Sequence, residues 1–200
     1  NNILVLFILL ILGFSPAIVQ AQCTGTDGSI TVCDKETDPN NQNFNLFNHL
    51  NGSPQTGGTW TAQNPVVKNA LSSDTGMLNL WAINQFGIYV FTYSHPNCPE
   101  TANVTVSLGG YPGEDNIGGG ANACSSNSAV DLFNFLDNNL TSLTADFNGT
   151  WSADVGTPSA FLNESTFNAT AAGPGTYTFI YTVDAIDTCP ARSARVTLEI

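Results

Sequence analysis

The sequence predicts an all-β chain of two tandem β-sandwich modules that follow an N-terminal secretory signal. Three motifs recur 91 positions apart, namely Gly58-Thr59-Trp60 as Gly149-Thr150-Trp151, Cys33 as Cys124, and Asn97-Cys98-Pro99 as Thr188-Cys189-Pro190. Repeated units of this size, rich in Thr, Val, Tyr and Gly, are typical of small β-domains arranged in series. We therefore expect a first module over residues 22–113 and a second over residues 114–200.

The N-terminus indicates a signal peptide over residues 1–21. Residues 3–12 form an uninterrupted apolar run, and a helix-breaking Pro16 and small residues before the predicted cleavage point follow it. The run is well short of the roughly 20 residues that a membrane-spanning helix needs. We expect export, an extracellular or outer-surface location, and no transmembrane anchor in the mature chain.

Cys23 stands just behind this signal, where a bacterial lipoprotein carries its lipidated cysteine. A lipobox has a small residue directly before that cysteine, whereas here Gln22 precedes it. Cleavage after Ala21 is the favoured interpretation, and lipidation of Cys23 is the alternative. The chain opens on Asn1 without an initiator Met or basic n-region, which we interpret as a short N-terminal truncation.

The composition is acidic and poor in charged residues. Four Lys and Arg stand against 16 Asp and Glu, which gives a formal net charge of −12. Such a surface repels nucleic acid and anionic membranes, so we expect no nucleic-acid partner. We also expect no cofactor. No EF-hand loop is present, so the pair Glu114-Asp115 and the group Asp34, Glu36 and Asp38 are interpreted as solvated loop charge. Calcium binding by these loops stays open.

The five cysteines predict one disulfide within each module. Cys33 to Cys98 and Cys124 to Cys189 are each separated by 65 positions, and equal spacing inside equal repeats favours these two pairs. Cys23 is then left as an unpaired thiol. Other connectivities stay open, and zinc binding is disfavoured because no Cys-x-x-Cys pair or nearby His cluster exists. In the chain-entropy model each bridge stabilises its module by roughly 4 kcal/mol.

Strand periodicity is clearest near the end of each module. In residues 176–183, aromatic and apolar side chains alternate with mostly Thr, and residues 87–93 match this segment in the first module. Closing strands follow at residues 102–108 and 194–200, where Val104 and Val106 match Val196 and Leu198. We expect a terminal hairpin in each sandwich. Its predicted core residues are Tyr89, Phe91, Tyr177 and Phe179.

Two further motifs recur earlier in each module. Residues 46–50 and 132–136 place apolar side chains at i, i+1 and i+4, which predicts a short capping helix or bent strand that plugs the sandwich. Trp60 and Trp151 are interpreted as core residues, because one large aromatic side chain fills the middle of a thin sandwich. Stacking of an exposed Trp on sugar is the alternative.

A Gly-dense stretch over residues 109–120 marks the boundary near residue 113. Part of this stretch must start the first strand of the second module, so the linker itself is short. We expect the two sandwiches to lie end to end with limited freedom.

The order of these motifs is also specific as a set. It runs Gly-Thr-Asp-Gly-Ser-Ile-Thr-Val-Cys, Leu-Phe-Asn, Gly-Gly-Thr-Trp-Thr, Gly-x-Tyr-x-Phe-x-Tyr, Cys-Pro and Ala-x-Val-Thr-Val, and covers nearly all of residues 24–200. This order resembles the tandem Ig-like repeats of very large surface proteins from Bacteroidetes, whose arrays often end in a gliding-motility-associated or type IX secretion sorting domain. The resemblance implies an Ig-like fold and an adhesin-like or stalk protein without catalytic residues. The sequence has no sorting domain and stops inside a predicted strand, which we interpret as C-terminal truncation.

Catalytic motifs are not found in the sequence. His49 and His95 have no counterparts in the other repeat, and no nucleophile elbow, zinc-protease or phosphate-binding motif is present. We therefore expect a structural or adhesive surface array, with an unknown protein or polysaccharide ligand bound outside these residues. The alternative is a pair of accessory modules of a secreted enzyme, in which Trp60, Trp151 or Trp81 would hold polysaccharide. Trp81 has no aromatic equivalent in the second copy, which favours the first interpretation.

Overall fold

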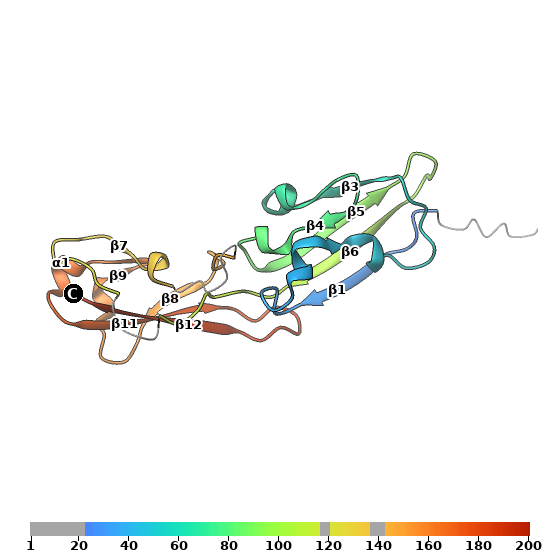
Figure 1. Ribbon diagram of the computed structural model, residues 1–200. Helices are drawn as coiled ribbons and strands as arrows, with labels where there is room; N and C mark the ends of the chain where they lie inside the picture. Colours follow the sequence, from blue (N-terminus) through green and yellow to red (C-terminus); the bar gives the residue numbers. More distant parts are fainter. Residues whose placement is uncertain (1–22, 117–120, 137–142) are drawn as a thin grey trace, which may run out of the picture.

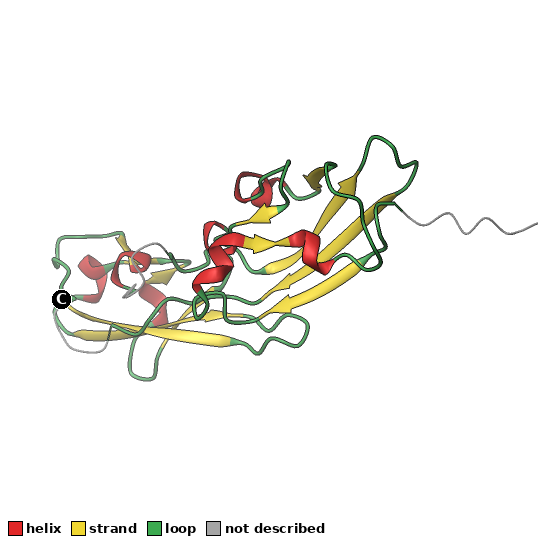
Figure 2. Cartoon of the chain, turned by 45° about the vertical axis from the view of Figure 1, so that its right-hand side comes forward, coloured by secondary structure: helices red, strands yellow, loops and turns green. Residues whose placement is uncertain are grey.

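The chain folds into two β-sandwich modules that lie end to end (Figure 1). The structure is a computed structural model that describes residues 23–116, 121–136 and 143–200, and the predicted signal peptide lies outside these ranges. Short helical turns lie mostly on one side of the long strands (Figure 2). Within the described ranges, every helix is too short or too polar to cross a membrane.

The first module has the strand order of an Ig sandwich. Its main sheet runs β1-β6-β5-β3, with β1 parallel to β6 and the other pairs antiparallel, and a small second sheet pairs β2 with β4. The order β3-β5-β6 corresponds to the C, F and G strands of that fold. The bounds are β1 Gly28–Val32, β2 Phe44–Asn45, β3 Thr59–Ala62, β4 Met77–Leu78, β5 Gly87–Ser94 and β6 Thr101–Leu108.

The second module repeats this order in its described residues. Its sheets run β12-β11-β8 and β7-β10-β9. Among its described residues, a parallel bridge between Asn122 and Glu199 stands at the place of the first strand. This bridge corresponds to the Thr31 and Ser107 pair of the first module. The bounds are β7 Val130–Asp131, β8 Thr150–Ala153, β9 Leu162–Asn163, β10 Thr166–Phe167, β11 Thr176–Val183 and β12 Arg192–Glu199.

Most of the short helices begin where a polar side chain caps the chain. Asn45 and Asp131 each accept a hydrogen bond from the backbone N–H two residues later, which starts a helical turn at matching places. Leu46 and Leu132 of these turns are fully buried, so the predicted plugs are confirmed as 3-10 helices. The helices are η1 Pro39–Asn43, η2 Leu46–His49, η3 Pro65–Ala70, η4 Leu80–Ala82, η5 Leu132–Phe135, η6 Ser159–Phe161 and α1 Ala169–Ala172.

The predicted terminal hairpins are confirmed in both modules. Phe91 pairs with Val104 in the first, and Phe179 pairs with Val196 in the second, so the matching of the two closing strands is correct. Tyr89, Phe91, Tyr177 and Phe179 are all buried in the two cores.

A tyrosine hydrogen bond near the start of β5 and β11 adds a second Ig feature. The Tyr89 hydroxyl donates to the Gln85 carbonyl at 2.9 Å, and the Tyr177 hydroxyl donates to the Ala172 carbonyl at 2.8 Å. A Tyr that bonds back to the backbone a few residues upstream is the tyrosine corner of Ig sandwiches. This bond holds the turn that leads into the F-type strand of each module.

The two Trp residues of the Gly-Thr-Trp motifs differ in burial. Trp60 is 2 % exposed, whereas Trp151 is only half-buried. In the first module the loop 73–76 lies over the indole, and a Cβ on Gly76 would lie 2.4 Å from the Trp60 Nε1 atom. In the second module a turn of two residues, Glu164 and Ser165, joins β9 to β10 and leaves Trp151 less covered. The predicted core role is confirmed for Trp60 and holds only in part for Trp151.

Candidate functional site at the module junction

The cysteines pair differently from the sequence-based prediction. Cys33 is bonded to Cys189 with a Cα–Cα distance of 5.1 Å, and Cys23 is bonded to Cys98 with a Cα–Cα distance of 5.8 Å. Cys124 is free and exposed. The predicted pairs Cys33–Cys98 and Cys124–Cys189, and the prediction that Cys23 is unpaired, are therefore wrong.

The direction of the first strand explains the error. Because β1 runs parallel to β6, Cys33 lies beside Gly109 at the end of β6, whereas Cys98 precedes the start of that strand. The eight residues of β6 separate these two places by about 26 Å at about 3.3 Å per residue. The Cα atoms of a disulfide lie only about 4.4–6.8 Å apart. The equal spacing of 65 positions thus reflects the repeat period rather than a contact.

The Cys33–Cys189 disulfide joins the two modules. We call Cys33 and Cys124, which follow the first strand of a module, leading cysteines. We call Cys98 and Cys189, which lie in the turn before its last strand, turn cysteines. The leading cysteine of the first module is thus bonded to the turn cysteine of the second. Cys189 is almost fully buried and Cys33 is partly buried, so most of this bond is shielded from solvent.

A fully buried ion pair lies in the same junction. The Lys35 Nζ atom lies 2.6 Å from an Asp146 carboxylate oxygen, and both side chains have no exposed surface. Lys35 also donates to the Ile83 carbonyl at 2.6 Å, and the second Asp146 carboxylate oxygen accepts from the Tyr111 backbone N–H at 2.8 Å. Each charge therefore has its ionic partner and one backbone partner, which a buried pair needs to offset desolvation.

Burial and attraction act in opposite directions on this pair. Burial lowers the pKa of Lys35 and raises the pKa of Asp146, and the attraction between the two groups offsets part of each shift. Tyr111, whose side chain is fully buried, donates to a Glu114 carboxylate oxygen at 3.2 Å. Burial first, and then that carboxylate, raise the pKa of Tyr111. A change at any one of these groups therefore alters the electrostatic environment of the others.

A second set of charges closes the junction near the disulfide. Arg192 forms ion pairs with Glu36 at 2.5 Å and with Asp34 at 3.3 Å, and the Glu36 side chain is only 8 % exposed. The Thr31 hydroxyl donates to an Asp187 carboxylate oxygen at 2.9 Å across the same boundary. The interpretation as solvated loop charge is therefore wrong for Glu36, whose side chain is buried against a cation of the other module. Asp34 meets the same cation but is 58 % exposed, as expected of a solvated charge.

The remaining acidic residues of those groups have local roles. Asp38 accepts from the Asn40 backbone N–H and caps η1, and Asp115 accepts from the Arg195 backbone N–H on β12. Glu114 accepts from Tyr111, as described above. The interpretation of Glu114 and Asp115 as solvated loop charge is therefore also wrong. In the described part of the chain, these carboxylates form no group of three that would hold a metal ion.

The first part of the Gly-rich linker, residues 109–113, is packed rather than loose. Residues 109–113 are all buried. A Cβ on Gly109 would lie 2.7 Å from the Cys33 carbonyl oxygen, and a Cβ on Gly110 would lie 2.6 Å from the Val183 Cβ atom. These two positions need glycine because the backbone passes directly between the modules. The short linker and the end-to-end arrangement were both expected from the sequence.

Contacts between residues 84–86 and residues 147–148 complete the junction. The Asn148 amide donates to the Phe86 carbonyl at 2.9 Å and accepts from the Phe86 backbone N–H at 3.1 Å. The Phe147 backbone N–H donates to the Asn84 carbonyl at 2.9 Å. Phe86, a residue of the first module, packs its side chain against the core of the second. The junction therefore combines covalent, ionic, hydrogen-bonded and apolar contacts.

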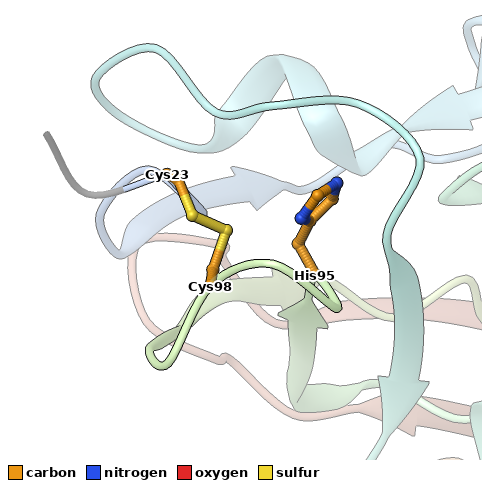
Figure 3. A group of neighbouring side chains, drawn as sticks. All are labelled: Cys23, His95 and Cys98. Atoms are coloured by element: carbon orange, nitrogen blue, oxygen red, sulfur yellow. A yellow bond between two sulfur atoms is a disulfide. The ribbon is translucent and has the colours of Figure 1, made fainter.

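The Cys23–Cys98 disulfide lies at the opposite end of the first module, beside His95. Figure 3 shows that Cys98 and His95 come from the turn after β5, whereas Cys23 comes from the N-terminal segment. One atom of each residue lies within 4.8 Å of the others, which is the distance range of a metal site. Both sulfurs are consumed by the disulfide, so the cluster offers no thiolate to a metal ion.

Sequence reasoning missed the residues that matter most at the junction. Lys35, Asp146 and Arg192 carried no motif, and they have no charged counterparts of the same sign in the other repeat. One available signal was scarcity, because Lys35 is one of only four basic residues and lies two positions after a cysteine. The other histidine, His49, stacks on Phe44 with ring centroids 4.7 Å apart, and burial lowers its pKa.

Comparisons with known proteins give no family for this chain. No family model and no curated protein matches it. Among solved structures it is similar to human Protocadherin-24 EC1-2 in crystal form II, with 12 % identity and a TM-score of 0.26, over 86 % of this chain and 94 % of that chain. A likeness at this TM-score carries no argument about function, so the fold class rests on the strand order described above.

Proposed function

We propose that this chain is a non-catalytic, exported cell-surface repeat protein whose modules form a rigid, adhesin-like stalk. The observation that carries the proposal is the junction. A disulfide, a fully buried ion pair and a buried glycine linker fix one module against the next. A flexible tether between two independent binding domains would need none of these contacts.

The junction is unusual for neighbouring domains, which move relative to each other unless their interface is large and apolar. Gly-rich linkers are normally flexible coils, but here the glycines are buried because the modules approach so closely. Loss of one partner from a buried ion pair costs about 3–5 kcal/mol. Bending at the junction would expose or separate that pair, so the straight arrangement is strongly favoured.

The disulfides and the charge support an extracellular place of work. The chain has two disulfides, and disulfides persist mainly in oxidising compartments. The net charge of −12 keeps such a surface soluble and away from anionic partners. The resemblance to Bacteroidetes surface repeats and to type IX secretion substrates belongs to the same proposal. On this proposal the protein or polysaccharide ligand binds outside these two modules.

Small-angle X-ray scattering of the exported chain tests the proposed rigidity. We expect one narrow, elongated distance distribution for the natural chain. A variant that combines Cys33→Ser, Cys189→Ser and Lys35→Met should give a broader distribution with a shorter mean. The natural chain would contradict the proposal if its distribution were as broad as that of the variant.

The alternative function, an accessory module of a secreted enzyme that acts on polysaccharide, is supported only at Trp151. Trp60 is buried, and the Trp81 indole N–H donates to the Lys35 carbonyl at 2.7 Å. Trp151, in contrast, borders a hollow of about 370 Å³ together with half-exposed Phe147 and Glu164. Its indole nitrogen is buried and has no hydrogen-bond partner among the described residues.

Tryptophan fluorescence titration with soluble polysaccharides distinguishes the two functions. Under the stalk proposal, no polysaccharide changes the emission of the natural chain. Saturable quenching that Phe147→Ala abolishes, and that Thr56→Ala at the matching place in the first module does not, would favour the accessory function instead.

A further inference from the structure

The two modules differ in how their cysteines are used. Both turn cysteines are bonded, Cys98 to Cys23 and Cys189 to Cys33. Of the two leading cysteines, Cys33 is bonded across the junction and Cys124 is free and exposed. Cys124 therefore repeats the Cys33 side of the inter-module disulfide but has no cysteine bonded to it.

The backbone around Cys124 repeats the backbone around Cys33. The parallel pairing of Thr31 with Ser107 recurs as that of Asn122 with Glu199. Just as Cys33 lies beside the end of β6, Cys124 therefore lies beside the end of β12. The C-terminus lies at the far end of the second module, away from the junction (Figure 1).

The other end of the first module shows what happens when a turn cysteine has no leading cysteine to meet. The Gln55 backbone N–H donates to the Cys23 carbonyl, as the Asp146 backbone N–H donates to the Tyr111 carbonyl. Cys23 thus occupies the place of Tyr111. It bonds Cys98 from within the same module and closes that end.

We propose that the exposed end of the second module at Cys124 is a docking site for a further module of the same kind, whose turn cysteine forms a disulfide with Cys124. The inference rests on the proposed function of a rigid array, and it follows from continuity with the existing junction. A second copy of this chain does not fit, because both of its turn cysteines are already bonded.

The side chains at this end define the chemistry of the incoming module. By the cysteine alignment, exposed Ser126 replaces Lys35. An acidic residue of the incoming module at the position that matches Asp146 would therefore be buried without a cation, which is unfavourable. The incoming module must be neutral there, as the first module is with Gln55.

The bond formation is a two-electron oxidation. The Cys124 thiol and the incoming thiol each lose a proton and an electron as the S–S bond forms. A small-molecule disulfide such as oxidised glutathione accepts both electrons and both protons and becomes two thiols. The joined modules gain a high effective concentration, of the order of millimolar for a short tether.

A three-module chain tests the proposal. Two glycines and a second copy of residues 23–108 are added after Ile200. The added copy carries Cys23→Tyr, because Tyr111 stands at that place in the existing junction, and Cys33→Ser, so that Cys98 is its single thiol. The chain is oxidised with glutathione, free thiols are alkylated, and peptic peptides are mapped by mass spectrometry at acidic pH. The added copy carries Gln55 and a free Cys98, as the chemistry above requires.

We expect a peptide that links Cys124 to the added Cys98 and nearly complete loss of Cys124 alkylation. At micromolar protein the tethered pair should form about a thousandfold more readily than a bond between chains. A Cys124 that stays fully alkylated, or that bonds to Cys124 of another chain, would overturn the inference.

Matched chains keep the result interpretable. An added copy that retains its own Cys23 should close its own Cys23–Cys98 bond and leave Cys124 alkylated, which also shows that the added copy folds. If it folds but the Cys23→Tyr copy does not bond to Cys124, the inference fails while the rigidity of the first junction, measured by scattering, still supports the proposed function. If the first junction is flexible, the proposed function fails as well.

Discussion

The two modules share the residues that build them and differ in the residues that join them. Trp60 and Trp151, the strand tyrosines and the paired valines recur at matching places and lie in or beside the two cores. The junction residues do not recur, since Lys35 corresponds to Ser126, and Asp146 to Gln55. Even the sign of the charge changes between Arg192 and its counterpart Glu100. Repetition thus specifies a module, and departures from repetition specify its neighbour.

Removal of the inter-module disulfide should produce the largest contrast. The double variant Cys33→Ser and Cys189→Ser opens the loop that this bond closes, across a sequence separation of 156 residues. In the chain-entropy model this lowers the free energy of unfolding by about 5 kcal/mol. Cys124→Ser should leave stability unchanged because its thiol is unbonded. Urea unfolding followed by Trp fluorescence measures the stability of both variants. Equal unfolding midpoints for the two variants would contradict the expected difference.

The buried ion pair should give the next largest difference between matching positions. Lys35→Met leaves the Asp146 carboxylate buried without its cation and should lower the unfolding free energy by about 3–5 kcal/mol. At the matching exposed position, Ser126→Met should change it by less than about 0.5 kcal/mol. The double variant Lys35→Met and Asp146→Leu should recover most of the loss, as measured by the same unfolding experiment. A failure to recover would mean that Lys35 acts through packing rather than charge.

Replacement of the Trp in each Gly-Thr-Trp motif should lower the free energy of unfolding by different amounts, because different loops lie over the two indoles. Trp60→Ala removes a fully packed side chain and should cost about 3–5 kcal/mol. Trp151→Ala should cost about 2 kcal/mol, since only part of its surface is buried. Thermal unfolding followed by circular dichroism would detect the difference. Equal losses would show that the four-residue loop over Trp60 adds nothing to its packing.

Alkaline pH should weaken both modules together. Burial, followed by the Asp146 carboxylate, raises the pKa of Tyr89 to about 12; burial also raises the pKa of Tyr181 to about 12. In the unfolded chain these groups lose their protons near pH 10. Between pH 10 and 12 the unfolded state therefore binds fewer protons than the folded state, and stability falls as the pH rises. Absorbance at 295 nm should show these two hydroxyls ionising only above pH 11, and ionisation near pH 10 without unfolding would contradict the burial argument.

Sequence periodicity was sufficient for the modules because it reports local structure. The alternation in residues 176–183 and the matching of Val104 with Val196 predicted the hairpins and their register. The direction of β1 carries no such signal, because a short strand can pair parallel or antiparallel to its neighbour with the same alternation of side chains. That unknown direction decided where Cys33 lies, and with it every disulfide.

The junction was not predictable from the sequence for a related reason. Asp146 lies 111 positions after Lys35, and each residue is an ordinary charge in an unpatterned loop. Their burial follows from the way two finished modules meet, which the pattern within either module does not contain. Gly109 and Gly110 were recognised as a boundary, but the close backbone approach that requires them was not.

Disulfide mapping of the exported two-module chain tests most directly the claim that the cysteines join the modules instead of closing them. Alkylation of free thiols, peptic digestion and mass spectrometry without reduction should yield Cys33–Cys189 and Cys23–Cys98, with Cys124 alkylated. Recovery of Cys33–Cys98 together with Cys124–Cys189, with Cys23 alkylated, would contradict the claim and make each module a separately closed unit.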